Sequence, residues 1–368
     1  MNEEIHPFRI QTPQADLDDL ADRLARTRWT GELAGVGDAY GVPLRQVQEL
    51  VAYWRDGYDW RAWEARLNSH PQFTTTIDGQ RIHFLHVRSP HPDATPLVLT
   101  HGWPMSVAEY LDVIAPLTEP QDPADAFHLV IPHLPGFGWS GPTTERGWDY
   151  RRTARAWAEL MRRLGYGRYG AHGNDAGSIV TPELGRVDPE HVVGVHVTQI
   201  LSFPSGDPAE TAGFDEADRE KLRFLEWFME HKGAFNKLQS TEPQTLAHAL
   251  ADSPVGQLAW SLQLFGDTVS PDYTLTNVMV HWLTGTAASA ARFYYENARA
   301  EPAAEPTTVP LGLANFAQDF QSIRPLAERD HKNIVSWNSY DRGSHFAAHD
   351  APDLLVGDIR GFFRGLAG

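Results

Sequence analysis

The sequence contains no cysteine, which excludes disulfide bonds, a catalytic thiol and thiolate metal ligands. It also lacks an apolar run of about 18 residues, the length that a transmembrane helix requires. The N-terminal residues MNEEIHPFRI are acidic and have no apolar segment typical of a secretory signal. We therefore expect a soluble protein that does not bind a membrane, and a cytoplasmic location is consistent with the absence of cysteine.

Positive charge is scarce as well, since 31 Lys and Arg residues against 48 Asp and Glu residues give a net charge of −17. This balance disfavours nucleic-acid binding. The histidines do not show the close spacing of a metal site, and no phosphate-binding or dinucleotide-binding glycine motif occurs. The sequence therefore predicts no metal and no cofactor. The sequence leaves open whether the protein is a monomer or a homodimer.

Two amphipathic patterns precede the first strands. Leucine and alanine recur at helical spacing over 15–29, and a second helical face follows Pro43. Alternating residues over 73–87 then predict a hairpin that turns at Asp78 and Gly79. We interpret residues 1–80 as an N-terminal helical domain.

From Pro96 onward, short apolar strands alternate with helices, which predicts the α/β class with a mostly parallel sheet covered on both faces. The pattern is interrupted over 203–300 by a helical, tryptophan- and phenylalanine-rich stretch, and it then resumes. We therefore expect a core formed by 81–202 and 301–368, with a helical cap inserted at 203–300.

The stretch YGAHGNDAGSIV, residues 169–180, places Asp175 in a glycine-flanked turn between a predicted strand and a predicted helix. This arrangement is typical of the nucleophile elbow of α/β-hydrolases, whose tight turn presents one side chain to the active site. An alternative interpretation is that Asp175 only caps the following helix, a position that aspartate favours.

Three other features favour the catalytic interpretation. The segment HGWP follows a strand, so that Trp103 and Ala176 could offer backbone N–H groups to an oxyanion. His345 precedes the last helix, and Asp319 follows a late strand. Nucleophile, acid and histidine then occur in the chain order of α/β-hydrolases. Each feature also has an ordinary structural explanation, and two other aspartates could replace Asp319 as the acid: Asp330 and Asp341.

The chain resembles the α/β-hydrolase-fold epoxide hydrolases related to microsomal and juvenile-hormone epoxide hydrolases, including their N-terminal domain. The similarity rests on residues 6–29 and 51–87 and on several later segments: HGWP, PHLPGFGWS, DSPVG, RFYYEN and GSHFAAHDAPDLL. The resemblance implies that an epoxide becomes a vicinal diol through an alkyl ester on Asp175. Water activated by His345, with Asp319 as its partner, would then hydrolyse this ester.

The same resemblance implies that Tyr294 acts as an acid from the cap. We expect Phe235, Tyr295 and Trp227 to contact the substrate, and the aromatic cap suggests an apolar or aromatic epoxide. The chain departs from the family pattern at several positions, among them Asp319, where microsomal relatives have glutamate. The elbow is Asn-Asp-Ala in place of Gly-Asp-Trp, and Phe235 stands where a second tyrosine is usual and cannot donate a hydrogen bond.

Two other functions fit parts of the pattern. A haloalkane dehalogenase uses the same aspartate and histidine, but Ala176 occupies the position where such enzymes commonly have tryptophan. A non-catalytic small-molecule-binding protein on a decayed hydrolase fold is the other possibility. The intact set of Asp175, Asp319 and His345 favours the epoxide hydrolase.

Overall fold

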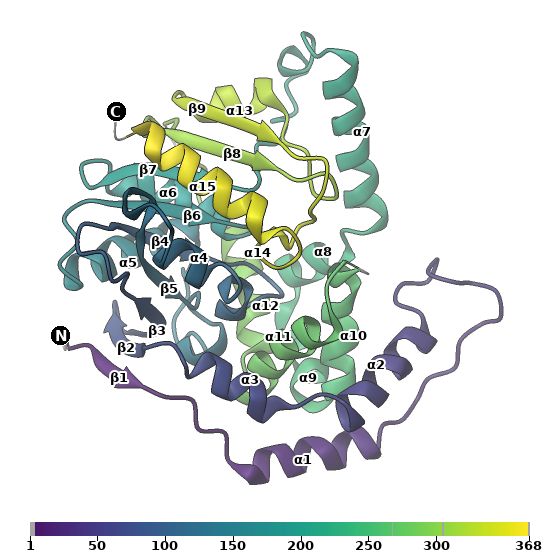
Figure 1. Ribbon diagram of the computed structural model, residues 1–368. Helices are drawn as coiled ribbons and strands as arrows, with labels where there is room; N and C mark the ends of the chain where they lie inside the picture. The colour runs from purple at the N-terminus through teal and green to yellow at the C-terminus, as the bar shows by residue number, and fades with distance from the viewer. Residues whose placement is uncertain (1–3, 267, 304, 367–368) are drawn as a thin grey trace.

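The computed structural model describes residues 4–266, 268–303 and 305–366. A nine-stranded sheet with the order β1-β2-β3-β5-β4-β6-β7-β8-β9 runs through it (Figure 1). The strands are β1 (His6–Phe8), β2 (Gln72–Ile77), β3 (Gln80–Val87), β4 (Thr95–Thr100), β5 (Phe127–Pro132), β6 (Tyr169–Gly173), β7 (Val192–Val197), β8 (Leu311–Asn315) and β9 (Ile334–Ser339).

The strands from β4 to β9 pair in parallel, whereas β1, β2 and β3 are joined to each other and to β5 by antiparallel pairing. Every residue of β5, β6 and β8 is buried, as parallel strands covered on both faces require. The predicted α/β class with a mostly parallel sheet is confirmed. The predicted hairpin is formed by β2 and β3, and Asp78 at its turn has a φ of 49°.

Helices cover both faces of the sheet and bury alternate side chains of each strand. Leu97 and Leu99 of β4 pack in one apolar cluster, which includes residues of α4 and α15. Val98 packs in a second cluster, which includes residues of α5 and α6. The helices of this core are α4 (Ile114–Thr118), α5 (Tyr150–Arg163), α6 (Gly177–Val187), α13 (Arg324–Asp330), α14 (Ala347–Asp350) and α15 (Pro352–Leu366).

Between β7 and β8 the chain leaves the sheet and forms a group of helices, which Figure 1 shows in teal and green beside the sheet. This is the region for which the sequence predicts a helical insertion. Its helices are α7 (Glu216–His231), α8 (Ala234–Thr241), α9 (Pro243–Asp252), α10 (Pro254–Phe265), α11 (Pro271–Thr284) and α12 (Ala287–Asn297). Helix α12 packs against α8 and α9. We call this group of helices the cap.

The N-terminal helices α1 (Gln14–Ala25), α2 (Leu44–Asp56) and α3 (Trp60–Leu67) pass along the cap, as the purple and blue ribbon in Figure 1 shows. Helices α1 and α2 contact α10, and α2 and α3 contact α11. The Trp54 indole N–H lies 3.3 Å from the sulfur of Met279. The N-terminal segment therefore braces the cap, while β1 ties the same segment to the edge of the sheet.

Candidate active site

The predicted elbow is present between β6 and α6, and Asp175 at its apex has a φ of 53°. A Cβ atom on Gly177 would lie 1.8 Å from the Thr100 carbonyl oxygen, and one on Gly173 would lie 2.0 Å from the Gly177 carbonyl oxygen. A Cβ atom on Gly102 would lie 2.0 Å from Asp175 Oδ1. The close approach of these segments therefore requires glycine at all three positions.

The Asp175 carboxylate does not cap α6. The N-cap residue is Ala176, and no side chain caps this helix. Instead, the Trp103 backbone N–H donates a hydrogen bond of 2.9 Å to Asp175 Oδ1. The amide of Ala176 lies at the start of the helix, where backbone N–H groups lack intrahelical acceptors. The segment HGWP and the elbow thus lie together, as the sequence predicts.

The structure brings three predicted residues into one chain of contacts. His345 Nε2 lies 3.5 Å from Asp175 Oδ2, and His345 Nδ1 lies 2.8 Å from Asp319 Oδ1. The two alternative acids lie elsewhere: Asp330 binds Arg329 at 2.7 Å, and Asp341 is exposed. Of the three candidate acids Asp319, Asp330 and Asp341, Asp319 is therefore the one that contacts the imidazole.

His345 lies between two negative charges. Burial alone would lower its pKa, but the carboxylates of Asp319 and Asp175 outweigh burial and hold the pKa of His345 well above its usual value. The two carboxylates therefore favour the protonated form of the imidazole. Asp175 is one of these two carboxylates. Any reaction that removes its negative charge would therefore lower the pKa of His345.

Aromatic rings surround the space next to the carboxylate. Trp103 stacks on Phe235 with centroids 5.5 Å apart, and the Tyr294 ring meets Trp103 edge-on at 6.0 Å. Burial, followed by the charge of Asp175 and the neighbouring Tyr150, raises the pKa of Tyr294 well above its usual value. The Tyr294 phenol therefore keeps its proton and remains a hydrogen-bond donor close to Asp175.

Two predicted substrate contacts are not brought into this cluster. The Trp227 side chain lies on α7 with 45% of its surface exposed, and its ring contacts Phe224 and His231. The Tyr295 ring lies under the Arg299 guanidinium at 3.5 Å. Consecutive residues of a helix point about 100° apart, so Tyr294 and Tyr295 face different surroundings. The proposed site therefore includes neither Trp227 nor Tyr295.

A second phenol, that of Tyr150, also lies near Asp175, although the sequence gives no sign of it. Tyr150 begins α5, and its backbone N–H donates to Asn297 Oδ1 of the cap at 2.8 Å. Burial and the charge of Asp175 raise the pKa of Tyr150, and its ring meets Phe293 edge-on at 5.2 Å. The Tyr150 phenol is therefore close enough to Asp175 to interact with its charge. No motif marks it, because α5 reaches the cap only in the folded chain.

A buried acid also lies beside the elbow. Glu109 is 1% exposed, and its Oε1 accepts a hydrogen bond of 2.8 Å from Asn174 Nδ2. Its Oε2 has no hydrogen-bond partner among the residues that the structure describes. Burial raises the pKa of Glu109 to about 8, so this carboxyl group is neutral at neutral pH and adds no third negative charge around His345.

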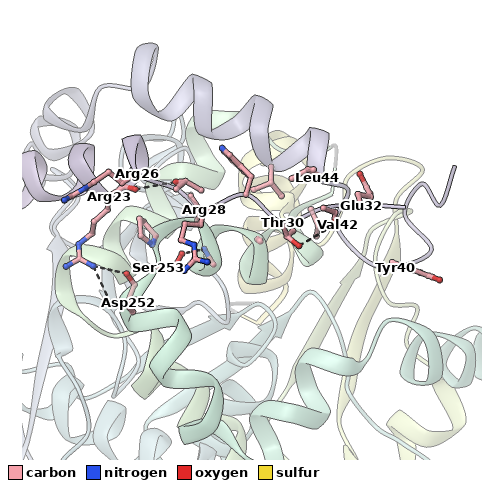
Figure 2. Close-up of a pocket in the computed structure, with 18 of the residues that line it drawn as sticks. Arg23, Arg26, Arg28, Thr30, Glu32, Tyr40, Val42, Leu44, Asp252 and Ser253 are labelled. Carbon is pink, nitrogen blue, oxygen red and sulfur yellow. Dashed lines mark hydrogen bonds and ion pairs between the residues drawn. The ribbon is translucent and has the colours of Figure 1, made fainter. Parts of the chain in front are cut away.

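A large groove elsewhere on the surface contains none of these residues. It has a volume of about 1050 Å³ and lies between the α1–α2 segment and the start of α10 (Figure 2). The side chain of Arg23 crosses it and donates to the Asp252 carbonyl oxygen at 2.9 Å. Within the described ranges, no group of three or more His, Asp or Glu side chains is arranged to hold a metal ion. The groove is therefore separate from the elbow and its neighbouring carboxylates.

The fold, the elbow and the order of the three residues define an α/β-hydrolase. Residues 95–243 match the family model described as alpha/beta hydrolase fold, and residues 5–110 match the one described as Epoxide hydrolase N terminus. Epoxide hydrolase 1 of Sus scrofa is 31% identical over 98% of this chain and 89% of its own length. The chain belongs to the epoxide hydrolase family.

Other relatives agree over nearly the whole chain. A protein of Stigmatella aurantiaca with a provisional epoxide hydrolase name is 43% identical over 98% of this chain and 85% of its own length. The structure of Aspergillus niger epoxide hydrolase has a TM-score of 0.87 at 30% identity, covering 99% of this chain and 97% of the other. Among the described residues, no helix has the length and apolar character needed to cross a membrane.

The buried Glu109 leads to a prediction about stability. Its pKa is about 8 in the folded protein and near 4.3 in an unfolded chain. Between these values the unfolded chain releases a proton that the folded protein keeps, so stability falls as pH rises. Glu109→Gln removes this loss. We expect the melting temperature of the variant relative to wild type to increase steadily from about pH 4.5 to about pH 8, and a difference independent of pH would contradict a buried neutral carboxyl group.

Proposed function

We propose that this protein hydrolyses an epoxide to a vicinal diol through an alkyl-enzyme ester on Asp175. The observation that carries the proposal is the placement of a carboxylate at the elbow, with His345 Nε2 3.5 Å from Asp175 Oδ2 and Asp319 behind the imidazole. Attack by serine on an oxirane carbon would form an ether, which water does not readily cleave. Attack by a carboxylate forms an ester, which water hydrolyses.

Ring opening is the first step. A carboxylate oxygen of Asp175 forms a bond to one oxirane carbon, and the bond from that carbon to the ring oxygen breaks with its electron pair. The ring oxygen becomes negatively charged in the transition state, and the Tyr294 phenol donates a hydrogen bond to it. Because the charge develops only as the bond breaks, this contact lowers the barrier more than it tightens binding.

The proton on His345 links the two steps. Formation of the ester removes the negative charge of Asp175, one of the two charges that hold the pKa of His345 high. The imidazole then loses its proton more readily, and the alkoxide needs one. Transfer of one proton leaves an alcohol and a neutral imidazole, so the charges balance. The neutral imidazole is the form that can act as a base.

Ester hydrolysis is the second step. His345 takes a proton from water, and the hydroxide attacks the carbonyl carbon of the Asp175 ester. The backbone N–H groups of Trp103 and Ala176 stabilise the oxyanion, and Asp319 stabilises the imidazolium. Collapse breaks the acyl C–O bond, releases the diol and restores the carboxylate of Asp175 beside a protonated His345.

The cap supports an epoxide over a haloalkane as substrate. A leaving halide needs donors placed for a departing ion, and Ala176 offers no side-chain donor. Tyr294 belongs to cap helix α12, and its phenol could donate to the ring oxygen of an epoxide, which stays attached to the substrate after the ring opens. The rings of Trp103, Phe235 and Tyr294 form an apolar wall, so we propose an apolar or aromatic epoxide.

The ester on Asp175 can be trapped. His345→Gln removes the base but leaves the nucleophile, so a substrate such as styrene oxide should add one substrate mass to the protein. Intact-mass analysis detects the adduct, and peptide mapping should place it on Asp175. The matched control, His345→Gln combined with Asp175→Ala, should remain unmodified. An adduct on another peptide would exclude Asp175 as the nucleophile.

Asp319→Asn tests the role of the acid. We expect turnover to fall about 10²-fold or more while alkylation survives, because general-base catalysis of the second step is lost. Single-turnover kinetics separates the two steps. Asp330→Asn and Asp341→Asn are matched controls and should remain close to wild type. Near-normal turnover in Asp319→Asn would show that another group supports His345.

Tyr294→Phe should slow alkylation about 10²-fold or more, the effect of losing one acid or oxyanion donor. Phe235→Tyr should leave the alkylation rate unchanged or raise it, because it can add a donor. Quenching of tryptophan fluorescence follows this step, since Trp103 borders the carboxylate. If Tyr294→Phe alkylates at the wild-type rate and Tyr150→Phe does not, Tyr150 opens the ring.

A further inference from the structure

The side chain of Gln199 connects the backbone of Asp175 with the carboxylate of Asp319. It lies two residues beyond the end of β7 and is 1% exposed. Its Oε1 accepts hydrogen bonds from the Asp175 backbone N–H at 2.9 Å and from Ser178 Oγ at 3.0 Å. Its Nε2 donates to Asn174 Oδ1 at 2.8 Å and to Asp319 Oδ2. The amide thus uses both its acceptor positions and both its donors.

The contacts fix which way the amide points. The backbone N–H of Asp175 can only donate, and the ionised carboxylate of Asp319 can only accept. Rotating the Gln199 amide by 180° would place its oxygen against the carboxylate and its NH₂ group against the N–H. Both contacts would then be repulsive, so a single orientation satisfies the site.

A second amide extends this connection to the loop of the base. Asn174 Oδ1 accepts from Thr198 Oγ1 at 2.6 Å as well as from Gln199. Asn174 Nδ2 donates to the His345 carbonyl oxygen at 2.8 Å and to Glu109. Two neighbouring amides therefore join the elbow, the end of β7, the loop of Asp319 and the loop of His345.

We propose that Gln199 is a positioning residue, which holds the Asp319 carboxylate in line with His345 and shares its negative charge. This role rests on the function proposed above. The role of Gln199 depends on the elbow residue Asn174, whose Oδ1 accepts the second N–H of the Gln199 amide. A smaller residue at 174 would leave one Gln199 N–H without its partner.

The proposed role has a consequence for proton affinity. The carboxyl groups of Asp175 and Asp319 contact the imidazole, and the buried Glu109 interacts with it electrostatically. Asp350 accepts a hydrogen bond from the backbone N–H of Ser344, the residue before His345. The Gln199 N–H group donates to Asp319 and so reduces the negative charge that acts on the imidazolium. Loss of that donor leaves the full charge facing His345, which favours the protonated imidazole. The neutral base would then form only at higher pH.

Two substitutions at Gln199 separate the role of its acceptor oxygen from the role of its donor N–H groups. Gln199→Glu keeps an oxygen for the Asp175 N–H but replaces the donor by a carboxylate that faces Asp319. We expect alkylation within about threefold of wild type and ester hydrolysis slowed about 30-fold or more, within the range for impaired general-base catalysis. Gln199→Met removes both functions in a neutral side chain of similar length, and its hydrolysis should slow about tenfold.

The decisive readout is the titration of His345 followed by NMR in the unliganded protein, with His345→Gln used to assign the signal. In both Gln199 variants the pKa of His345 should be higher than in wild type, and the pH profile of hydrolysis should shift the same way. The matched control is Gln257→Met, which removes another buried amide, one that donates to the Val278 carbonyl oxygen at 2.9 Å. This control should lose stability without changing the titration.

The outcomes distinguish this role from the proposed reaction. An unchanged titration of His345 in both folded Gln199 variants would overturn the role of Gln199, whatever the substrate. A shifted titration combined with no epoxide turnover in wild type would support Gln199 and exclude the proposed reaction. If Gln199→Glu fails to fold, Gln199→Met decides the question alone.

Discussion

A carboxylate held in a left-handed backbone conformation is the feature on which the site depends. Asp175 has a φ of 53°, a conformation that costs free energy in any residue with a side chain. The turn is possible because Gly102, Gly173 and Gly177 let three backbone segments approach more closely than a Cβ atom would allow. The same approach brings the Trp103 N–H to 2.9 Å from the carboxylate. Backbone packing therefore orients the Asp175 carboxylate, the proposed nucleophile, and places a hydrogen-bond donor beside it.

The charges around the His345 imidazole would make its proton affinity respond to the proposed reaction. Asp175 and Asp319 hold the proton on His345, and Glu109 stays neutral because it is buried. Conversion of Asp175 to an ester would leave Asp319 as the only charged partner. The same histidine would then serve as a counterion in the first step and as a base in the second. Gln199 would adjust the remaining charge.

The sequence reveals the parts of the site that lie in continuous segments. The elbow is visible because glycines flank Asp175 within five residues, and the strand-helix alternation predicts the sheet that carries it. The chain order of Asp175, Asp319 and His345 requires only that each follows a predicted strand. These features depend on local backbone geometry, which composition and periodicity report directly.

Contacts made between distant segments could not be predicted in the same way. In the sequence, nothing distinguishes Gln199 from other polar residues that follow a strand. Its proposed role depends on the carboxylate of Asp319, which lies 120 residues later. Tyr150 begins a core helix and reaches the site only because the cap packs onto that end. Trp227 shows the opposite case, since its position among cap aromatics suggested a substrate contact, whereas helix α7 leaves it 45% exposed.

The central claim is that water attacks the carbonyl carbon of an ester on Asp175 and not the epoxide itself. A single turnover in water enriched in oxygen-18, with enzyme in excess over an epoxide, distinguishes the two directly. If the ester forms, the heavy oxygen enters the Asp175 carboxylate, and the first diol released contains only unlabelled oxygen. Mass analysis of the diol and of the peptide that contains Asp175 gives both values. Labelled diol with an unlabelled Asp175 peptide would show that water opens the ring directly and would contradict the claim.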